Sequence, residues 1–134
     1  MAKIESKIGK IGYNDERIFG FLSDFNNFNP LLQGKVENWE STSDTCRFSV
    51  KGMADMSMKI VEKEPNKLIK ITDDGSAPLK FTLWIQLKQV APYDTRVKIT
   101  VRPEVNVMMR MMVKKPFKQF ADNLVDTLEK FPFP

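Results

Sequence analysis

The stretch RPEVNVMMRMMVKKPFKQFADNLVDTLEKF, residues 102–131, predicts one long amphipathic helix by the spacing of its apolar residues. At about 100° per residue counted from Val105, the large apolar side chains form one broad stripe. Its members are Val105, Met109, Met112, Val113, Phe117, Phe120, Leu124, Leu128 and Phe131. The opposite side is charged, at Lys114, Lys118, Asp122 and Glu129. We expect a helix over 107–131, capped by Asn106 and about 40 Å long.

Two features of this helix depart from an ordinary amphipathic pattern. Pro116 lies inside it and should remove one backbone hydrogen bond and introduce a kink. Met108 and Met111 lie off the apolar stripe, next to basic residues. We favour their being covered by the short helices or by loops, and docking on a membrane surface or on a partner protein is the alternative.

Working outward from the helix, the apolar period changes to two between residues 35 and 103, which predicts β-strands. The apolar positions alternate as Cys46, Phe48 and Val50; Met56, Met58 and Ile60; Phe81, Leu83, Ile85 and Leu87; and Val97, Ile99 and Val101. Turn-forming residues separate these runs at 41–44, 64–67, 73–78 and 91–94. We therefore expect six strands in consecutive hairpins, in an antiparallel sheet with one apolar face and one wet face.

The N-terminal part predicts a strand followed by two short helices. Residues 3–9 alternate weakly, and the inner side of that strand would hold Ile4 and Ile8. Asn14 is a suitable N-cap for a helix over 15–23, which begins with two acidic residues. Asparagines and a proline then interrupt the helical spacing, so the second helix is short and lies near 25–32.

Length and composition exclude several classes of function. A chain of 134 residues suits one domain, 1–134, and has no apolar run long enough to span a membrane. Without histidine there is no Ser–His or Cys–His mechanism, and with Cys46 as the one cysteine we expect neither a disulfide nor a metal site. The net charge of +4 is read as an ordinary soluble surface. We expect a cytoplasmic protein that does not bind nucleic acid.

The predicted order, one strand, two short helices, six strands and a long helix, is an α+β arrangement in which a strongly curved antiparallel sheet of about seven strands wraps around the helix. Three segments resemble the helix-grip superfamily, also called START-like, SRPBCC or polyketide cyclase/dehydrase-like. YNDERIFGFLSDFNNFNPLL at 13–32 resembles its first helix pair, KGMADMSMKIVEKEPNKLIKI at 51–71 its central hairpin, and 102–131 its C-terminal helix. The resemblance covers nearly the whole chain and implies the fold rather than one function.

The resemblance implies a cavity between the concave sheet face and the long helix. The strand alternation and the helix stripe predict its apolar lining, which comprises Phe48, Met56, Met58, Phe81, Leu83, Ile85, Val97, Ile99, Val101, Met109, Met112 and Phe117. Apolar walls of this kind suit a lipid, sterol, quinone or polyketide-like aromatic. The same side chains are large enough to fill the space completely, so an open pocket and a solid core are both left open.

Polar groups that would orient a ligand are few, and none is a catalytic residue of a known motif. The candidates at the pocket or its mouth are Ser6, Asn38, Arg102 and Glu104. We expect a carrier of a small apolar ligand, acting without cofactor or metal, as a monomer or a homodimer. The alternatives are a cyclase- or dehydratase-type enzyme and a protein-interaction module like the chaperone-activator or ribosome-associated branches.

Overall fold

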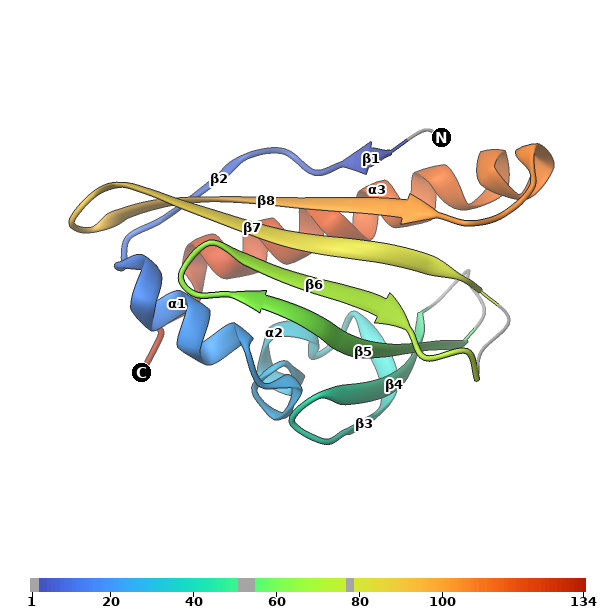
Figure 1. Cartoon of the computed structure of the whole chain (residues 1–134), viewed down its shortest axis with the longest axis horizontal. Coiled ribbons are helices and arrows are strands. Elements are labelled where there is room, and N and C mark those ends of the chain that lie inside the picture. The colour runs from blue at the N-terminus through green and yellow to red at the C-terminus, as the bar shows by residue number, and fades with distance from the viewer. Residues whose placement is uncertain (1–2, 51–54, 77–78) are drawn as a thin grey trace.

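The computed structural model describes residues 3–50, 55–76 and 79–134, and consists of a curved antiparallel sheet packed on a long helix (Figure 1). The strands are β1 (Ile4–Glu5), β2 (Gly9–Ile11), β3 (Val36–Ser41), β4 (Thr45–Val50), β5 (Asp55–Glu64), β6 (Leu68–Asp73), β7 (Phe81–Ala91) and β8 (Asp94–Pro103). The helices are α1 (Asp15–Leu22), the 3-10 turn η1 (Phe25–Asn27), α2 (Asn29–Leu32) and α3 (Val107–Lys130). This is the predicted order, and the long helix lies within one residue of its expected bounds.

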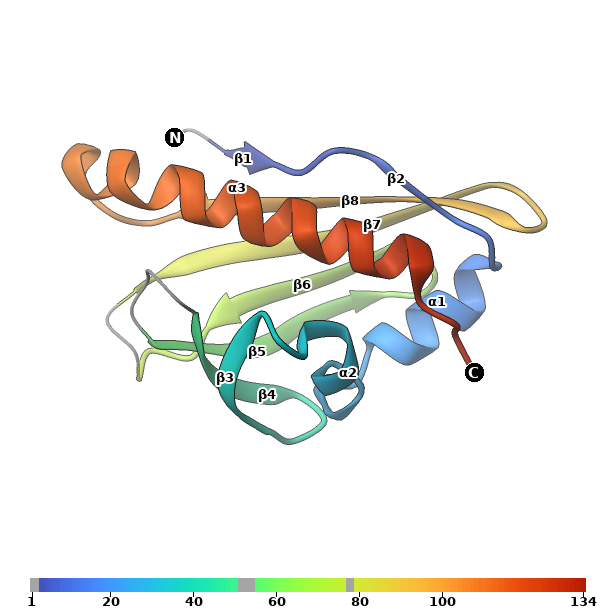
Figure 2. The same ribbon diagram turned by 180° about the vertical axis from the view of Figure 1, so that it is seen from behind.

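The sheet runs in the order β1-β8-β7-β6-β5-β4-β3, with β2 also paired to β8, and all of these pairs are antiparallel. The six strands from β3 to β8 are therefore the predicted meander. Seen from behind, α3 runs across the concave face of the sheet, while α1 and α2 lie between its C-terminal half and the β3 side (Figure 2). This places the core between α3 and the sheet.

The N-terminal strand is divided in two, because its register against β8 shifts by one residue. Ile4 pairs with Val101, but Gly9 pairs with Val97, so one additional residue lies on the N-terminal side. An extra residue inverts which side chains point inward. Ile8 is consequently 67% exposed, and the prediction that it shares the buried side with Ile4 was wrong.

A second register shift lies in β3, between Glu37 and Glu40. Asn38 occupies this bulge with a φ of 57° and is exposed, so its predicted inward orientation was also wrong. The extra residue turns Trp39 toward the core instead, where its ring packs against Phe48 at 5.4 Å between centroids.

The two parts of α3 differ sharply in burial. From Val113 onward the helix contributes a buried stripe, which comprises Val113, Phe117, Phe120, Ala121, Leu124, Val125 and Leu128. Near its N-terminus it projects beyond the ends of the strands (Figures 1 and 2). Met109 and Met112 are 40% and 65% exposed there, so the predicted burial of these two residues was wrong. An apolar stripe is buried only where another element lies opposite it.

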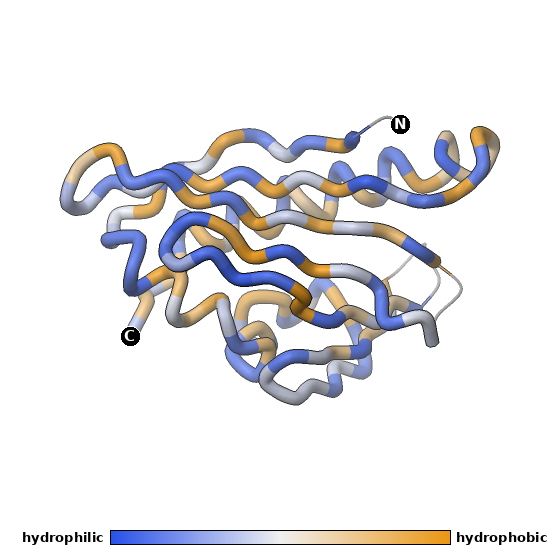
Figure 3. Tube along the Cα trace, in the orientation of Figure 1, coloured by the Kyte–Doolittle hydropathy of each residue, from blue (hydrophilic) through white to orange (hydrophobic). Residues whose placement is uncertain are grey.

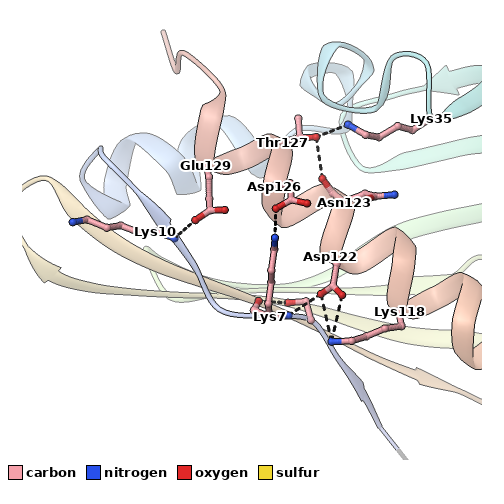
Figure 4. A network of polar contacts seen from close by, with 10 residues as sticks. Lys7, Lys10, Lys35, Lys118, Asp122, Asn123, Asp126, Thr127 and Glu129 are labelled. Carbon is pink, nitrogen blue, oxygen red and sulfur yellow. Dashed lines mark hydrogen bonds and ion pairs between the residues drawn. The ribbon is translucent and has the colours of Figure 1, made fainter.

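Side chains on α3 fasten its C-terminal half to the N-terminal segment (Figure 4). The Asp122 carboxylate accepts a hydrogen bond from the Lys7 backbone N–H at 2.8 Å, and Glu129 accepts one from the Lys10 N–H at 3.0 Å. The Lys7 ammonium pairs with Asp126, and this contact raises the pKa of Lys7. The three acidic residues lie four and three residues apart, so they line one side of the helix. We call this group of contacts the α3 clamp.

Close to the residues of the clamp, α3 also packs directly against β2 at Gly9. A Cβ atom built on Gly9 would lie 2.4 Å from the Val125 Cγ1, and 3.2 Å from both the Val97 Cγ1 and the Glu129 Cγ. Branched side chains buried in a packed core have little freedom to move away. Only glycine therefore allows the helix and strand to approach this closely.

We expect Gly9→Ala to lower the free energy of unfolding by about 1–3 kcal/mol, because the added methyl group would overlap Val125. Urea denaturation monitored by circular dichroism measures the change. Gly20→Ala is the matched control, since Gly20 lies within α1 with no atom near its would-be Cβ. It should raise stability by up to about 1 kcal/mol. Equal effects of the two substitutions would contradict the close approach at Gly9.

We expect Asp122→Ala to lower the free energy of unfolding by about 1 kcal/mol, because the Lys7 N–H loses its acceptor. Lys118, which also contacts this carboxylate, would keep its 2.7 Å hydrogen bond to the Glu5 carbonyl. The same denaturation assay applies, with Asn123→Ala on the adjacent, exposed position of α3 as a neutral control. An unchanged midpoint for Asp122→Ala would show that the clamp does not stabilise the fold.

Candidate functional site

The concave sheet face and α3 form an apolar interior. Ten of the predicted pocket residues lie there and are at most 2% exposed, namely Phe48, Met56, Met58, Phe81, Leu83, Ile85, Val97, Ile99, Val101 and Phe117. The ring centroids of Phe81 and Phe117 are 5.6 Å apart, which joins the sheet directly to the helix. Their near-zero exposure means that these side chains pack closely on their neighbours. That they line a ligand site stays a prediction.

An aromatic stack extends from this interior toward the β3 side. Phe28, Trp39, Phe48 and Phe120 follow one another with centroid separations of 6.4, 5.4 and 6.2 Å and interplanar angles of at most 26°. The Trp39 indole Nε1 is buried and has no hydrogen-bond partner among the residues that the structure describes. A buried indole N–H normally finds a partner, so this donor is available to a polar atom that comes near it.

A cleft of about 460 Å³ opens beside the end of this stack, between α3 and the segment that joins α2 to β3. Its lining comprises Leu32, Gly34, Lys35, Val50, Pro116, Gln119, Phe120 and Asn123. The buried or half-buried members are apolar, and the lysine, glutamine and asparagine are exposed. The cleft therefore has an apolar floor and a polar rim. We call it the α3 groove.

The exposed methionines of α3 fall into two groups relative to the α3 groove. Met109 and Met112 precede Pro116 by seven and four residues, so they continue the groove side of the helix toward its N-terminus. Met108 and Met111 precede Lys115 by the same intervals and lie on the outer side. The groove thus has an apolar extension, although neither methionine is buried.

Arg110, in the first turns of α3, lies on the same side of the helix as the buried stripe. It was not among the site residues predicted from the sequence. It lies seven residues, about two turns, before Phe117, and is half-buried. Its Nε is buried without a hydrogen-bond partner among the described residues. The spacing of the sequence could have identified it, because Arg110 lies seven residues before Phe117 and three before Val113, and residues at these intervals share one side of a helix.

The predicted polar residues lie elsewhere than at a cavity mouth. The Arg102 guanidinium lies over the outward-facing Trp84 ring, 5.6 Å from its centroid, and Glu104 is exposed and 3.7 Å from Arg102. The expectation that Arg102 lines the mouth of the cavity was wrong, because Arg102 alternates with the inward-pointing Val101 of β8 and its side chain lies on the outer face of the sheet. Ser6 is buried, but its hydroxyl already donates to the Lys7 carbonyl and accepts from the Ile99 N–H.

Two acidic residues near the open end of the sheet serve the turn after β6. Asp73 shares the inward parity of Ile69 and Ile71, and its carboxylate accepts from the backbone N–H groups of Phe81 and Gly75. Hydrogen bonds from Ser57 and Ser76 to Asp74 hold the pKa of that carboxyl at about 2. These contacts give both carboxylates a structural role in the turn.

Within residues 3–50, 55–76 and 79–134, the structure contains no cluster of side chains suited to holding a metal ion. Over the same residues, no helix combines the length and the apolar character that crossing a membrane requires.

Comparison with known proteins identifies the fold. No family model matches the chain, and no curated sequence does. A START superfamily protein from Mycobacterium smegmatis matches with a TM-score of 0.75 at 16% identity, over 95% of this chain and 94% of that one. A protein from Thermus thermophilus matches with a TM-score of 0.77 at 16% identity, over 96% and 95%. Norcoclaurine synthase from Thalictrum flavum matches with a TM-score of 0.71 at 13% identity, over 97% and 87%.

These matches and the observed topology define the class. The chain has a helix-grip fold of the START-like, or SRPBCC, type, in which a curved antiparallel sheet holds a long C-terminal helix. The resemblance seen in the sequence is confirmed for the fold. Sequence identities of 13–16% support a shared fold but not a shared function, so the function has to be argued from the residues of this chain.

Cys46 provides a chemical probe of the burial of strand β4. It lies on β4 two residues from Phe48 and is buried, and desolvation raises the pKa of its thiol to about 12. We expect it to react with Ellman's reagent at least about 100-fold more slowly than a small thiol, because reaction requires local opening. Concentrated guanidinium chloride should restore a normal rate. Rapid labelling of the native protein would contradict the burial of this strand.

Proposed function

We propose that this protein binds a small apolar ligand in the α3 groove and carries it without chemically changing it. The observation that supports this most directly is the apolar floor formed by Leu32, Val50 and Phe120, which lies open beside the helix. A concave site with apolar walls and a few polar groups at its rim is the usual form of a small-molecule site. The helix-grip fold agrees with this proposal.

The ligand would lie along the groove side of α3 and cover its exposed methionines. Met109 and Met112 extend the apolar floor beyond Pro116, and together they leave much apolar surface in water. Contact with an apolar ligand removes this surface from water, which is favourable. Methionine suits such a wall because its unbranched, flexible side chain adapts to ligands of different shape.

The first turns of α3 are the part of the wall that has freedom to adjust. The α3 members of the clamp, and Lys118 that contacts the Glu5 carbonyl, all lie on the far side of Pro116. Pro116 has no N–H to donate to the Met112 carbonyl, so the helix is weakest where the groove begins. The segment 107–115 would therefore move relative to the clamped half when a ligand enters.

Ligand binding is tested with dodecanoate as an apolar probe and Trp39 fluorescence as the signal. Trp84→Phe removes the second tryptophan, which lies on the outer face of the sheet. Trp39 stacks between Phe28 and Phe48, in the aromatic stack whose last member, Phe120, lines the α3 groove. We expect a saturable change in its emission, and native mass spectrometry of the freshly purified protein should detect a co-purified lipid-like molecule.

A pair of substitutions on one helix turn locates the site. Met109→Glu should weaken dodecanoate binding at least about tenfold, because it places a charge against the apolar ligand. Met111→Glu, two residues further on and therefore on the opposite side of the same turn, should leave binding unchanged. Both residues are exposed, so neither change should affect folding, which thermal denaturation checks. No saturable binding, or equal effects of the two variants, would contradict a ligand site in the α3 groove.

A further inference from the structure

The outer side of the first turns of α3 exposes three large apolar side chains. Val107, Met108 and Met111 are 66%, 74% and 76% exposed. They are followed on the same side by Lys114 and Lys115, which are also exposed. We call these five residues the outer methionine face. Single exposed apolar residues are normal on a protein surface, but an adjacent set of this size on one helix end indicates an interaction.

The charge around this face has one sign. The stretch 105–121 contains Arg110, Lys114, Lys115 and Lys118 and no acidic residue. Lys118 contacts Asp122 and the Glu5 carbonyl, whereas Lys114 and Lys115 form no ion pair with a residue that the structure describes. The nearest acidic residue before this stretch, Glu104, lies beside Arg102. The face thus combines apolar side chains with positive charge that is not neutralised locally.

The position of the face makes it accessible to a flat surface. The beginning of α3 projects past the ends of the strands at one end of the molecule, as both ribbon views show (Figures 1 and 2). In Figure 3 apolar and hydrophilic segments alternate around this projecting end. The face thus lies at one end of the molecule rather than over the sheet.

The chemistry of the face discriminates among possible partners. In a twofold dimer built on it, Lys114 and Lys115 of one copy would approach those of the other, and like charges oppose such an interface. An anionic bilayer is complementary in both respects, because its headgroups attract lysine and its acyl boundary accepts methionine. We propose that the outer methionine face docks this protein on the surface of an anionic lipid membrane. This inference does not depend on ligand binding in the α3 groove.

Sedimentation with vesicles tests this inference. The full chain is mixed with vesicles of phosphatidylcholine alone and with vesicles in which part of the phosphatidylcholine is replaced by phosphatidylglycerol. We expect binding to the second kind that is at least about tenfold tighter and that weakens as salt is added, because screening reduces the attraction of lysine to the surface. Absence of binding, or equal binding to both kinds of vesicle, would overturn the proposal.

Substitutions at the methionines and at the lysines separate the apolar from the electrostatic contribution to vesicle binding. Met108→Glu combined with Met111→Glu should reduce vesicle binding at least about tenfold, and Lys114→Gln combined with Lys115→Gln should reduce it and remove most of its salt dependence. Met109→Glu, on the groove side, is the matched control and should bind vesicles like the unmodified chain. Glutamate near a helix N-terminus is favourable, so loss of the helix does not explain a loss of binding.

A parallel measurement of molar mass by light scattering distinguishes a membrane surface from a self-association surface. A dimer that becomes monomeric in the Met108→Glu/Met111→Glu variant, with vesicle binding unchanged, would overturn the proposal. The same variants distinguish this proposal from the ligand proposal, because dodecanoate binding should respond to Met109→Glu and vesicle binding to the Met108→Glu/Met111→Glu pair. Either proposal can thus fail while the other is upheld.

Discussion

The attachment of α3 to the N-terminal segment determines how the long helix lies on the sheet. An edge strand leaves backbone N–H groups without sheet partners, and here the carboxylates of Asp122 and Glu129 accept from the N–H groups of Lys7 and Lys10. The absence of a side chain at Gly9 lets the helix approach until Val125 touches the strand. These contacts fix the direction of α3 across the sheet, and with it the distance between helix and core.

Because the attachment is confined to one half of α3, a single helix has two environments. Beyond Pro116 it is an ordinary amphipathic helix, with Phe117, Phe120 and Leu124 buried and its acidic residues tied to the strand. Before Pro116 its apolar side chains are mostly exposed and its charge is positive. The same sequence period therefore produces core in one half and accessible surface in the other, according to what lies opposite.

This difference explains which parts of the structure were predictable from the sequence. Period-two alternation identified the six strands of the meander, and Asn14 and Asn106 identified the two helix starts, because these signals are local. The orientations of Ile8 and Asn38 were not predictable, since one additional residue in a strand inverts parity without changing composition. The exposure of Met112 was missed because an apolar stripe does not reveal where its partner element ends.

Met109 and Met111 lie on opposite sides of one helical turn, and this relates the two proposed activities in space. With Met108 and Met111 in the headgroup region, Met109 would face away from the bilayer while belonging to the same turn. The weakest point of the helix, Pro116, is where the clamped half begins. A membrane contact on the outer side would therefore act on the segment that borders the α3 groove, while the clamped core remains unchanged.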